Sequence, residues 1–313
     1  MRGLFPANSH NWNIVSIDVG DAWEYRDEWG ILHRRPKDAL YYSVWRSPLA
    51  GDHITLEDVC AHQWPHTGDP QRIAGLCELA IQYRAHGKAV MIKGVLAGIF
   101  EMSQRMRGMQ NILLDLVANE TLACALLDKM LELKLAFWEM ALPQLADMID
   151  VISEADDYAT QESQIVSPRM FRQIFKPRLA TLFKRIKQLA PGVKLFFHSC
   201  GNVRPLLPDF IEIGVDILNP VQTTATGMDP AALKRDFGKD IVFWGGGVDT
   251  QGILPRGTPQ QVKENVRRNI DALAPGGGFV FNTVHNIQAD VPPENIVAMW
   301  EALGESCDVK PKI

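Results

Sequence analysis

Short apolar runs alternate with longer amphipathic stretches along most of this chain, and this alternation constrains the fold more than any other feature. The apolar runs have the length of buried strands and lie at residues 89–92, 148–152, 193–197, 215–218, 241–244 and 279–281. Apolar residues at helical spacing mark the stretches around them, at residues 69–86, 119–145, 168–189, 203–213, 259–273 and 293–303. Because a helix after each strand returns the chain to the same end of a sheet, we expect consecutive strands to run in parallel.

A weaker β-like run at residues 13–18 adds one further expected strand, which leaves the total one short of a (β/α)8 barrel. A doubly wound sheet stays open as an alternative. Against it, no G-x-G-x-x-G motif follows an early strand, and the glycines at 245–247 come after a late one. We therefore predict an α/β fold of the (β/α)8 TIM-barrel type.

The first part of the chain differs from the rest. It is rich in Trp, Asp, His and Pro and in residues typical of turns. We predict that residues 1–66 form an irregular N-terminal segment or lid and that residues 67–313 form the barrel body. No linker, low-complexity segment or internal repeat interrupts the chain, so we expect a single domain.

Composition excludes several classes of protein. The chain has 313 residues, of which 46% are hydrophobic and 22% charged, and this is too apolar for a disordered protein. A formal net charge of −5 provides no basic field, so we expect neither nucleic acid nor a membrane surface as partner. No apolar stretch approaches the roughly 18 residues of a membrane-spanning helix. Five irregularly spaced cysteines favour reduced thiols and a cytoplasmic location.

Polar residues at the carboxyl ends of the strands are informative, because a parallel barrel gathers its functional groups there. His198 and Cys200 close a fully apolar run, and side chains two residues apart on an extended chain point to the same side. Imidazole nitrogen and thiolate are preferred ligands of zinc. We predict that this pair binds zinc. The alternative is a buried thiol beside a hydrogen-bonded histidine.

The later strand ends carry further candidates. His285 closes the last strand and is a candidate third zinc ligand or a substrate contact, and Asn286 beside it is a candidate for substrate binding. Asp249 and Gln251 follow the glycines at 245–247, which let backbone approach a ligand closely. A tight strand-to-helix turn is the alternative there. The other candidates for substrate binding are Tyr158, Gln161 and Asn219.

Three carboxylates lie close together after the run at residues 148–152, at Glu154, Asp156 and Asp157. Mutual repulsion in such a cluster raises at least one carboxyl pKa unless a cation lies nearby. We predict catalytic roles for these three residues, as general acids or bases. Helix capping and a solvated turn are the alternative.

A set of motifs follows one order along the chain. They lie at residues 27–30, 107–108, 155–161, 167–171, 198–202, 245–251 and 285–296. Taken together, they resemble the uroporphyrinogen decarboxylase superfamily, and more closely its corrinoid-dependent methyltransferase branch. Each motif is weak alone, and the ordered set is more specific.

The resemblance implies a distorted TIM barrel whose pocket lies at the carboxyl ends of the strands. It also implies transfer of a methyl group to or from the cobalt of a corrinoid carried by a partner protein. In the branch that methylates thiols, zinc is held by an H-x-C pair and a later cysteine. His198 and Cys200 match the pair, but His285 stands roughly where that cysteine is expected. Glu154 is a further candidate ligand.

These observations lead to a prediction of function. A methyl ether or amine is a poor substrate for demethylation unless its heteroatom is polarised, by zinc as a Lewis acid or by a carboxylic acid. We expect a methyltransferase that acts between a small methylated substrate and a corrinoid protein, with homo-oligomers possible. The alternatives are a decarboxylase, a non-catalytic barrel that binds a corrinoid partner, and a generic zinc hydrolase. Against the decarboxylase, residues 1–13 hold only Arg2, where that branch has an arginine-rich segment.

Overall fold

The computed structural model describes residues 1–7, 15–95 and 97–307. The chain forms two compact units, one of Met1–Asp156 with Gln173–Val193 and one of Asp157–Arg172 with Lys194–Ile313. The boundary predicted at residue 66 does not separate these units, since residues on both sides of it belong to the first. The predicted carboxylate cluster, in contrast, is divided, because Asp157 begins a segment of the second unit.

Three parallel strands form the first sheet of the first unit. β6 (Val90–Lys93) lies between β1 (Arg2–Leu4) and β7 (Val151–Ala155), with Ile92 opposite Ile152. β1 was not expected from the sequence, because three residues are too few to carry a strand pattern. The first strand was expected at residues 13–18 instead. Residues 13 and 14 lie outside the described residues, and residues 17–18 belong to a different sheet.

The segment predicted to be irregular is in fact largely ordered. It holds a four-stranded antiparallel sheet in the order β2 (Ile17–Asp18), β3 (Ala22–Arg26), β4 (Leu32–Pro36) and β5 (Ser43–Arg46), followed by helix α1 (Leu56–Ala61). The turn between β3 and β4 is built locally. Asp27 Oδ1 accepts the backbone N–H groups of Trp29 and Ile31, and Gly30 takes a positive φ of 79°.

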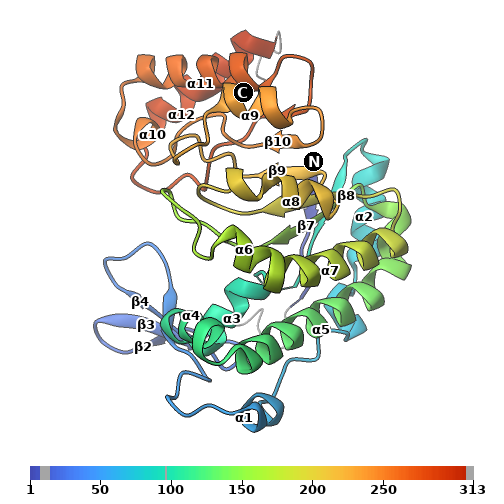
Figure 1. Cartoon of the computed structure of the whole chain (residues 1–313). Coiled ribbons are helices and arrows are strands. Elements are labelled where there is room, and N and C mark those ends of the chain that lie inside the picture. The colour runs from blue at the N-terminus through green and yellow to red at the C-terminus, as the bar shows by residue number, and fades with distance from the viewer. Residues whose placement is uncertain (8–14, 96, 308–313) are drawn as a thin grey trace. The chain divides into compact units, whose positions relative to one another are not determined.

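Helices complete the first unit: η1 (Pro70–Ile73), α2 (Leu76–Ala85), α3 (Ile99–Arg107), α4 (Met109–Ala118), α5 (Glu120–Leu145), η2 (Ala146–Met148) and α7 (Lys176–Leu189). α5 has 26 residues and lies beside α7 (Figure 1). Its buried residues follow the helical repeat, from Leu122 and Leu126 through Met130 to Phe137, and include Lys134. No helix in the described part of the chain is long and apolar enough to span a membrane.

Four parallel strands form the sheet of the second unit, in the order β8 (Lys194–His198), β9 (Ile217–Asn219), β10 (Val242–Trp244) and β11 (Phe279–Val280). The β8–β9 register places His198 opposite Asn219. Together with the three parallel strands of the first unit, these make seven parallel strands among the described residues. Each of the six apolar runs overlaps a strand, so the predicted alternation of parallel strands and helices is confirmed.

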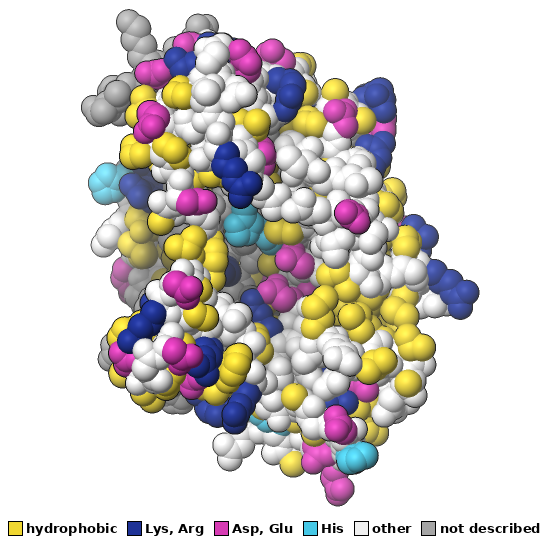
Figure 2. Space-filling model, turned by 90° about the vertical axis from the view of Figure 1, so that its left-hand side faces the viewer, with side chains coloured by type: hydrophobic (Ala, Val, Ile, Leu, Met, Phe, Trp, Pro, Cys, Tyr) yellow, Lys and Arg dark blue, Asp and Glu magenta, His cyan; other side chains and the backbone are white. Residues whose placement is uncertain are grey.

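The helical elements of the second unit are α6 (Pro168–Met170), η4 (Arg204–Leu206), α8 (Leu207–Glu212), α9 (Pro230–Phe237), α10 (Ile253–Arg256), α11 (Pro259–Leu273) and α12 (Pro293–Cys307). The π-helical turn η3 (Phe171–Phe175) crosses the boundary between the units. α11 and α12 lie side by side (Figure 1) and enclose a core that includes Val262, Val266 and Ala302. On the face seen in Figure 2, acidic and basic side chains are interspersed.

Asp156 holds the beginning of α3. Its two carboxylate oxygens accept the backbone N–H groups of Phe100 and Glu101, at 2.9 and 2.8 Å, and the residue is fully buried. A Cβ atom on Gly98 would lie 2.0 Å from the Asp156 side chain, so position 98 must be glycine. A carboxylate at a helix N-terminus also interacts favourably with the helix dipole. Asp156 therefore caps a helix, which was the alternative to its predicted catalytic role.

We expect Asp156→Ala to lower the free energy of unfolding by about 3 kcal/mol, because two N–H groups at a buried helix end lose their acceptor. Urea unfolding followed by circular dichroism measures this. Asp147→Ala removes an exposed acidic side chain of the same unit and should change stability by less than about 0.5 kcal/mol. Equal stabilities of the two variants would contradict the capping role.

Candidate functional site

Three potential metal ligands come together in the second unit. His198 is the last residue of β8, Cys200 follows two positions later, and His285 lies in the loop after β11. One ligand atom from each lies within 4.8 Å of the other two. The two imidazole rings meet edge to face, with centroids 6.2 Å apart. The structure thus brings together the three metal ligands predicted from the sequence.

Hydrogen bonding defines which nitrogen of His198 carries the proton. Asn219 Nδ2 donates to the carbonyl oxygen of Trp244 at 2.8 Å, so its Oδ1 is the atom that faces His198. His198 Nδ1 lies 2.6 Å from this oxygen and must donate to it. The lone pair of the neutral ring is then on Nε2, which lies 3.3 Å from Cys200 Sγ. Asn219, predicted to bind substrate, thus fixes the orientation of the His198 ring.

The ligand set fits zinc. Two ligand atoms at the usual zinc distances are about 3.5 Å apart in a tetrahedral site, close to the 3.3 Å between His198 Nε2 and Cys200 Sγ. Two imidazoles and one thiolate are the ligand types that zinc takes in catalytic sites. Three protein ligands leave a fourth position for a water molecule or a substrate atom.

His285 is suited to bind a metal at neutral pH. Partial burial and the neighbouring His198 lower the pKa of His285 below its ordinary value, and Asp157 opposes this shift. Since a lowered pKa keeps the imidazole neutral to lower pH, the lone pair that binds a metal stays available.

Asp157 is the carboxylate of the predicted cluster that lies with the metal ligands. Its Oδ1 accepts the backbone N–H of Cys200 at 2.8 Å and so holds the loop that carries the thiol. Its Oδ2 has no hydrogen bond among the described residues.

Glu154 has a different environment. It is 3% exposed, and its oxygens accept from Lys134 Nζ and from Trp138 Nε1, each at 2.6 Å. Lys134 also donates to the carbonyl oxygen of Val95. The three carboxylates of the predicted cluster therefore have separate partners. The role of Lys134 as the partner of Glu154 was not predicted, although a lysine within the apolar stripe of a long helix indicates a buried partner.

The remaining candidates for substrate binding are placed as follows. Tyr158 is fully buried, with its ring packed on Phe171 and Phe210. Asp249 accepts the backbone N–H groups of residues 251, 252 and 253, so its carboxylate closes the turn after β10.

Gln161, Gln251 and Asn286 remain available at the surface. Gln161 Nε2 donates to Gln251 Oε1 at 2.9 Å, which links two loops of the second unit. Asn286 is exposed and follows His285 directly. These three predicted substrate-binding residues thus lie on exposed loops of the second unit.

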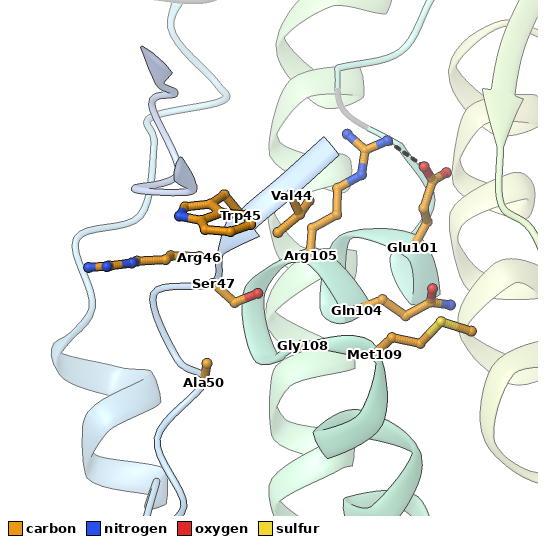
Figure 3. A pocket seen from close by; sticks show the side chains of 10 residues that line it. All are labelled: Val44, Trp45, Arg46, Ser47, Ala50, Glu101, Gln104, Arg105, Gly108 and Met109. Carbon is orange, nitrogen blue, oxygen red and sulfur yellow. Dashed lines mark hydrogen bonds and ion pairs between the residues drawn. The ribbon is translucent and has the colours of Figure 1, made fainter. Parts of the chain in front are cut away.

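Two of the cavities in the first unit share lining residues. The strand-end cavity, of about 450 Å³, is lined by residues at the ends of β1, β6 and β7, among them Phe5, Lys93 and Ala155. The β5 cavity, of about 620 Å³, lies between β5 and helices α3 and α4 (Figure 3). Both are lined by Glu101 and Arg105, which bond to each other at 2.5 Å. A pocket at the carboxyl ends of the strands was implied by the family resemblance, and the strand-end cavity lies at such ends. The β5 cavity was not expected from the sequence.

Comparison with known proteins identifies relatives. The family model for uroporphyrinogen decarboxylase (URO-D) matches residues 47–306. A uroporphyrinogen decarboxylase of Acidiphilium cryptum is 29% identical over 140 residues, which are 44% of this chain and 37% of that protein. A uroporphyrinogen decarboxylase of Psychromonas ingrahamii is 25% identical over 145 residues, 45% of this chain and 38% of that protein. The match therefore spans less than two fifths of the length of these relatives.

A solved structure resembles the chain over a larger part. A methyltransferase from Methanosarcina mazei superposes with a TM-score of 0.64 at 19% identity, over 88% of this chain and 76% of that one. At this identity the likeness shows the fold, and it confirms the predicted α/β barrel class.

Removal of the Asn219 amide should weaken metal binding. We expect Asn219→Ala to lower zinc affinity about tenfold to a hundredfold, because His198 loses the acceptor that fixes its tautomer and orientation. Competition with a chromophoric zinc chelator measures this. The control is Asn282→Ala, which removes an exposed asparagine of the same unit. Equal zinc affinity in both variants would contradict the orienting role.

Proposed function

We propose a methyl-transfer reaction for this chain, which belongs to the uroporphyrinogen decarboxylase family. The methyl group moves between a small methylated substrate and the cobalt of a corrinoid held by a partner protein. The substrate is a methyl ether or a methylated amine. The observation that carries the proposal is the group of His198, Cys200 and His285, with one ligand atom of each within 4.8 Å of the others.

The three residues suit a zinc ion that acts on the substrate. When bound, zinc would act as a Lewis acid on the heteroatom that carries the methyl group. His198, oriented by Asn219, and Cys200 would hold the ion together with His285. Asp157, whose Oδ2 has no hydrogen bond among the described residues, is assigned the proton exchange with the heteroatom.

The choice of substrate rests on the ligand set and on leaving-group chemistry. An ether oxygen or an amine nitrogen releases a methyl group only when its developing charge is neutralised, which a Lewis acid or a proton can do. A second cysteine, as in the branch that methylates thiols, is absent from the metal-ligand group of the described residues, where His285 takes part instead. We therefore assign this chain to demethylation.

Loss of the metal ligands should abolish the reaction. With a reduced corrinoid protein as acceptor and a panel of methyl ethers and amines, the visible absorbance of cobalt reports methyl transfer. We expect the double variant His198→Ala/Cys200→Ala to lower the rate at least about a hundredfold, because several kcal/mol of Lewis-acid stabilisation are lost. Metal analysis of the same samples should give about one zinc per chain in the wild type and none in the variant.

A matched control removes an exposed histidine and an exposed cysteine from the first unit, in the double variant His53→Ala/Cys60→Ala. Its zinc content and rate should equal those of the wild type. Unchanged methyl transfer in His198→Ala/Cys200→Ala would refute the metal part of the proposal.

Decarboxylation is the second candidate, and it is favoured by the names of the two relatives from Acidiphilium cryptum and Psychromonas ingrahamii. It requires no corrinoid partner. Release of labelled carbon dioxide from carboxylate substrates by the chain alone would support it. Binding of a corrinoid protein without any turnover would support a non-catalytic barrel instead.

A further inference from the structure

The strand-end cavity of the first unit has the size and position of a ligand site. Its volume of about 450 Å³ falls within the range of small-molecule pockets, roughly 300–1,000 Å³. It lies at the carboxyl ends of β1, β6 and β7, which is the end of a parallel barrel that carries function. The antiparallel sheet and α3 supply the rest of its lining.

The carboxylates that line this cavity already have cationic or N–H partners. Glu28 bonds through both oxygens to Arg72, at 3.2 and 2.8 Å. Asp27 lies 2.7 Å from His33 Nε2 and also accepts two backbone N–H groups. Glu101 pairs with Arg105, as Figure 3 shows from the β5 cavity. Each of these acids therefore already accepts hydrogen bonds from within the unit.

Lys93 is different. It is the last residue of β6, it is exposed, and it lines the cavity. Among the described residues its ammonium group has no hydrogen bond and no ion pair. An ammonium group without a partner in the lining favours an anion as ligand.

The apolar part of the lining indicates the body of the ligand. Phe5 lines the cavity although 61% of it is exposed, so a large aromatic face lacks cover. Trp29 and Met102 add apolar surface. The Tyr25 ring stacks on His33, with centroids 4.6 Å apart, and its hydroxyl has no hydrogen bond among the described residues. Burial raises the pKa of Tyr25, so the phenol stays protonated and able to donate.

We propose that the strand-end cavity binds a small organic carboxylate with a flat apolar body, and that the Lys93 ammonium contacts the carboxylate. Phe5 and Trp29 would cover the apolar body, and the Tyr25 hydroxyl would donate to a polar substituent. The binding inference stands on this cavity alone.

Calorimetric titration with three probes that share a phenyl ring tests the charge preference of the cavity. Benzoate, benzamide and benzyltrimethylammonium share the ring and differ in charge. We expect benzoate to bind about tenfold more tightly than benzamide, because it forms a charge-assisted contact, and we expect the cation to bind most weakly. Added salt should weaken benzoate binding and leave benzamide unchanged. Equal affinities for benzoate and benzamide would overturn the proposal.

Variants at position 93 test whether Lys93 causes the preference for benzoate. Lys93→Met should lower the affinity for benzoate to that for benzamide, and Lys93→Arg should retain the preference because it keeps the charge. The control Lys88→Met removes an exposed lysine of the same unit and should behave as the wild type. A benzoate preference that survives in Lys93→Met would overturn the role of Lys93.

The titrations need neither a corrinoid protein nor turnover, so the two proposals fail separately. Benzoate binding that depends on Lys93, without methyl transfer from any of the methyl ethers and amines, would support the carboxylate site and contradict the proposed function. Methyl transfer by a protein that binds benzoate and benzamide equally would support the proposed function and overturn the carboxylate site.

Discussion

The candidate metal centre depends on the parallel register that sets His198 at the end of β8 opposite Asn219 at the end of β9. This register allows one amide to bridge the strand ends, with its nitrogen on the Trp244 carbonyl oxygen and its oxygen on His198 Nδ1. The second imidazole nitrogen is thereby left as a lone-pair donor beside the Cys200 sulfur. Because successive strand residues face opposite sides, a shift of one residue would separate the amide from the imidazole.

In the first unit, the dominant constraint is the partnering of buried charge. The pairs Glu28–Arg72, Glu154–Lys134 and Asp115–Arg107 all lie inside the unit. An unpaired charge there would cost several kcal/mol, so each acid is matched by a cation. Lys93 is exposed and tolerates the lack of a partner, because water solvates its ammonium group until a ligand replaces it. The strand ends of the two units therefore offer different chemistry. Those of the second unit carry the predicted metal ligands, and those of the first unit carry the unpaired ammonium group of Lys93.

Sequence patterns predicted the strands and helices whose apolar faces are long and regular. Helix α11 begins and ends at the predicted residues 259 and 273, and each of the six apolar runs overlaps a strand. The first strand could not be found in this way, since β1 has three residues and is defined by its pairing with β6. The antiparallel sheet of the first unit was also missed. Its strands are rich in charged and aromatic residues, and its β3–β4 turn is closed by the Asp27 side chain rather than by a turn motif read from the sequence.

The sequence by itself determined the parallel α/β class and the residue types at the strand ends, because apolar periodicity and the His-x-Cys spacing are local properties of the chain. Only the tertiary structure decided what these side chains do. It brought His285 to His198 and Cys200, assigned Asp156 to the start of α3, and paired Glu154 with Lys134 from the middle of a helix. Hydrogen bonds and ion pairs of this kind join residues far apart in the chain. Their partners are therefore set by packing, which no local pattern encodes.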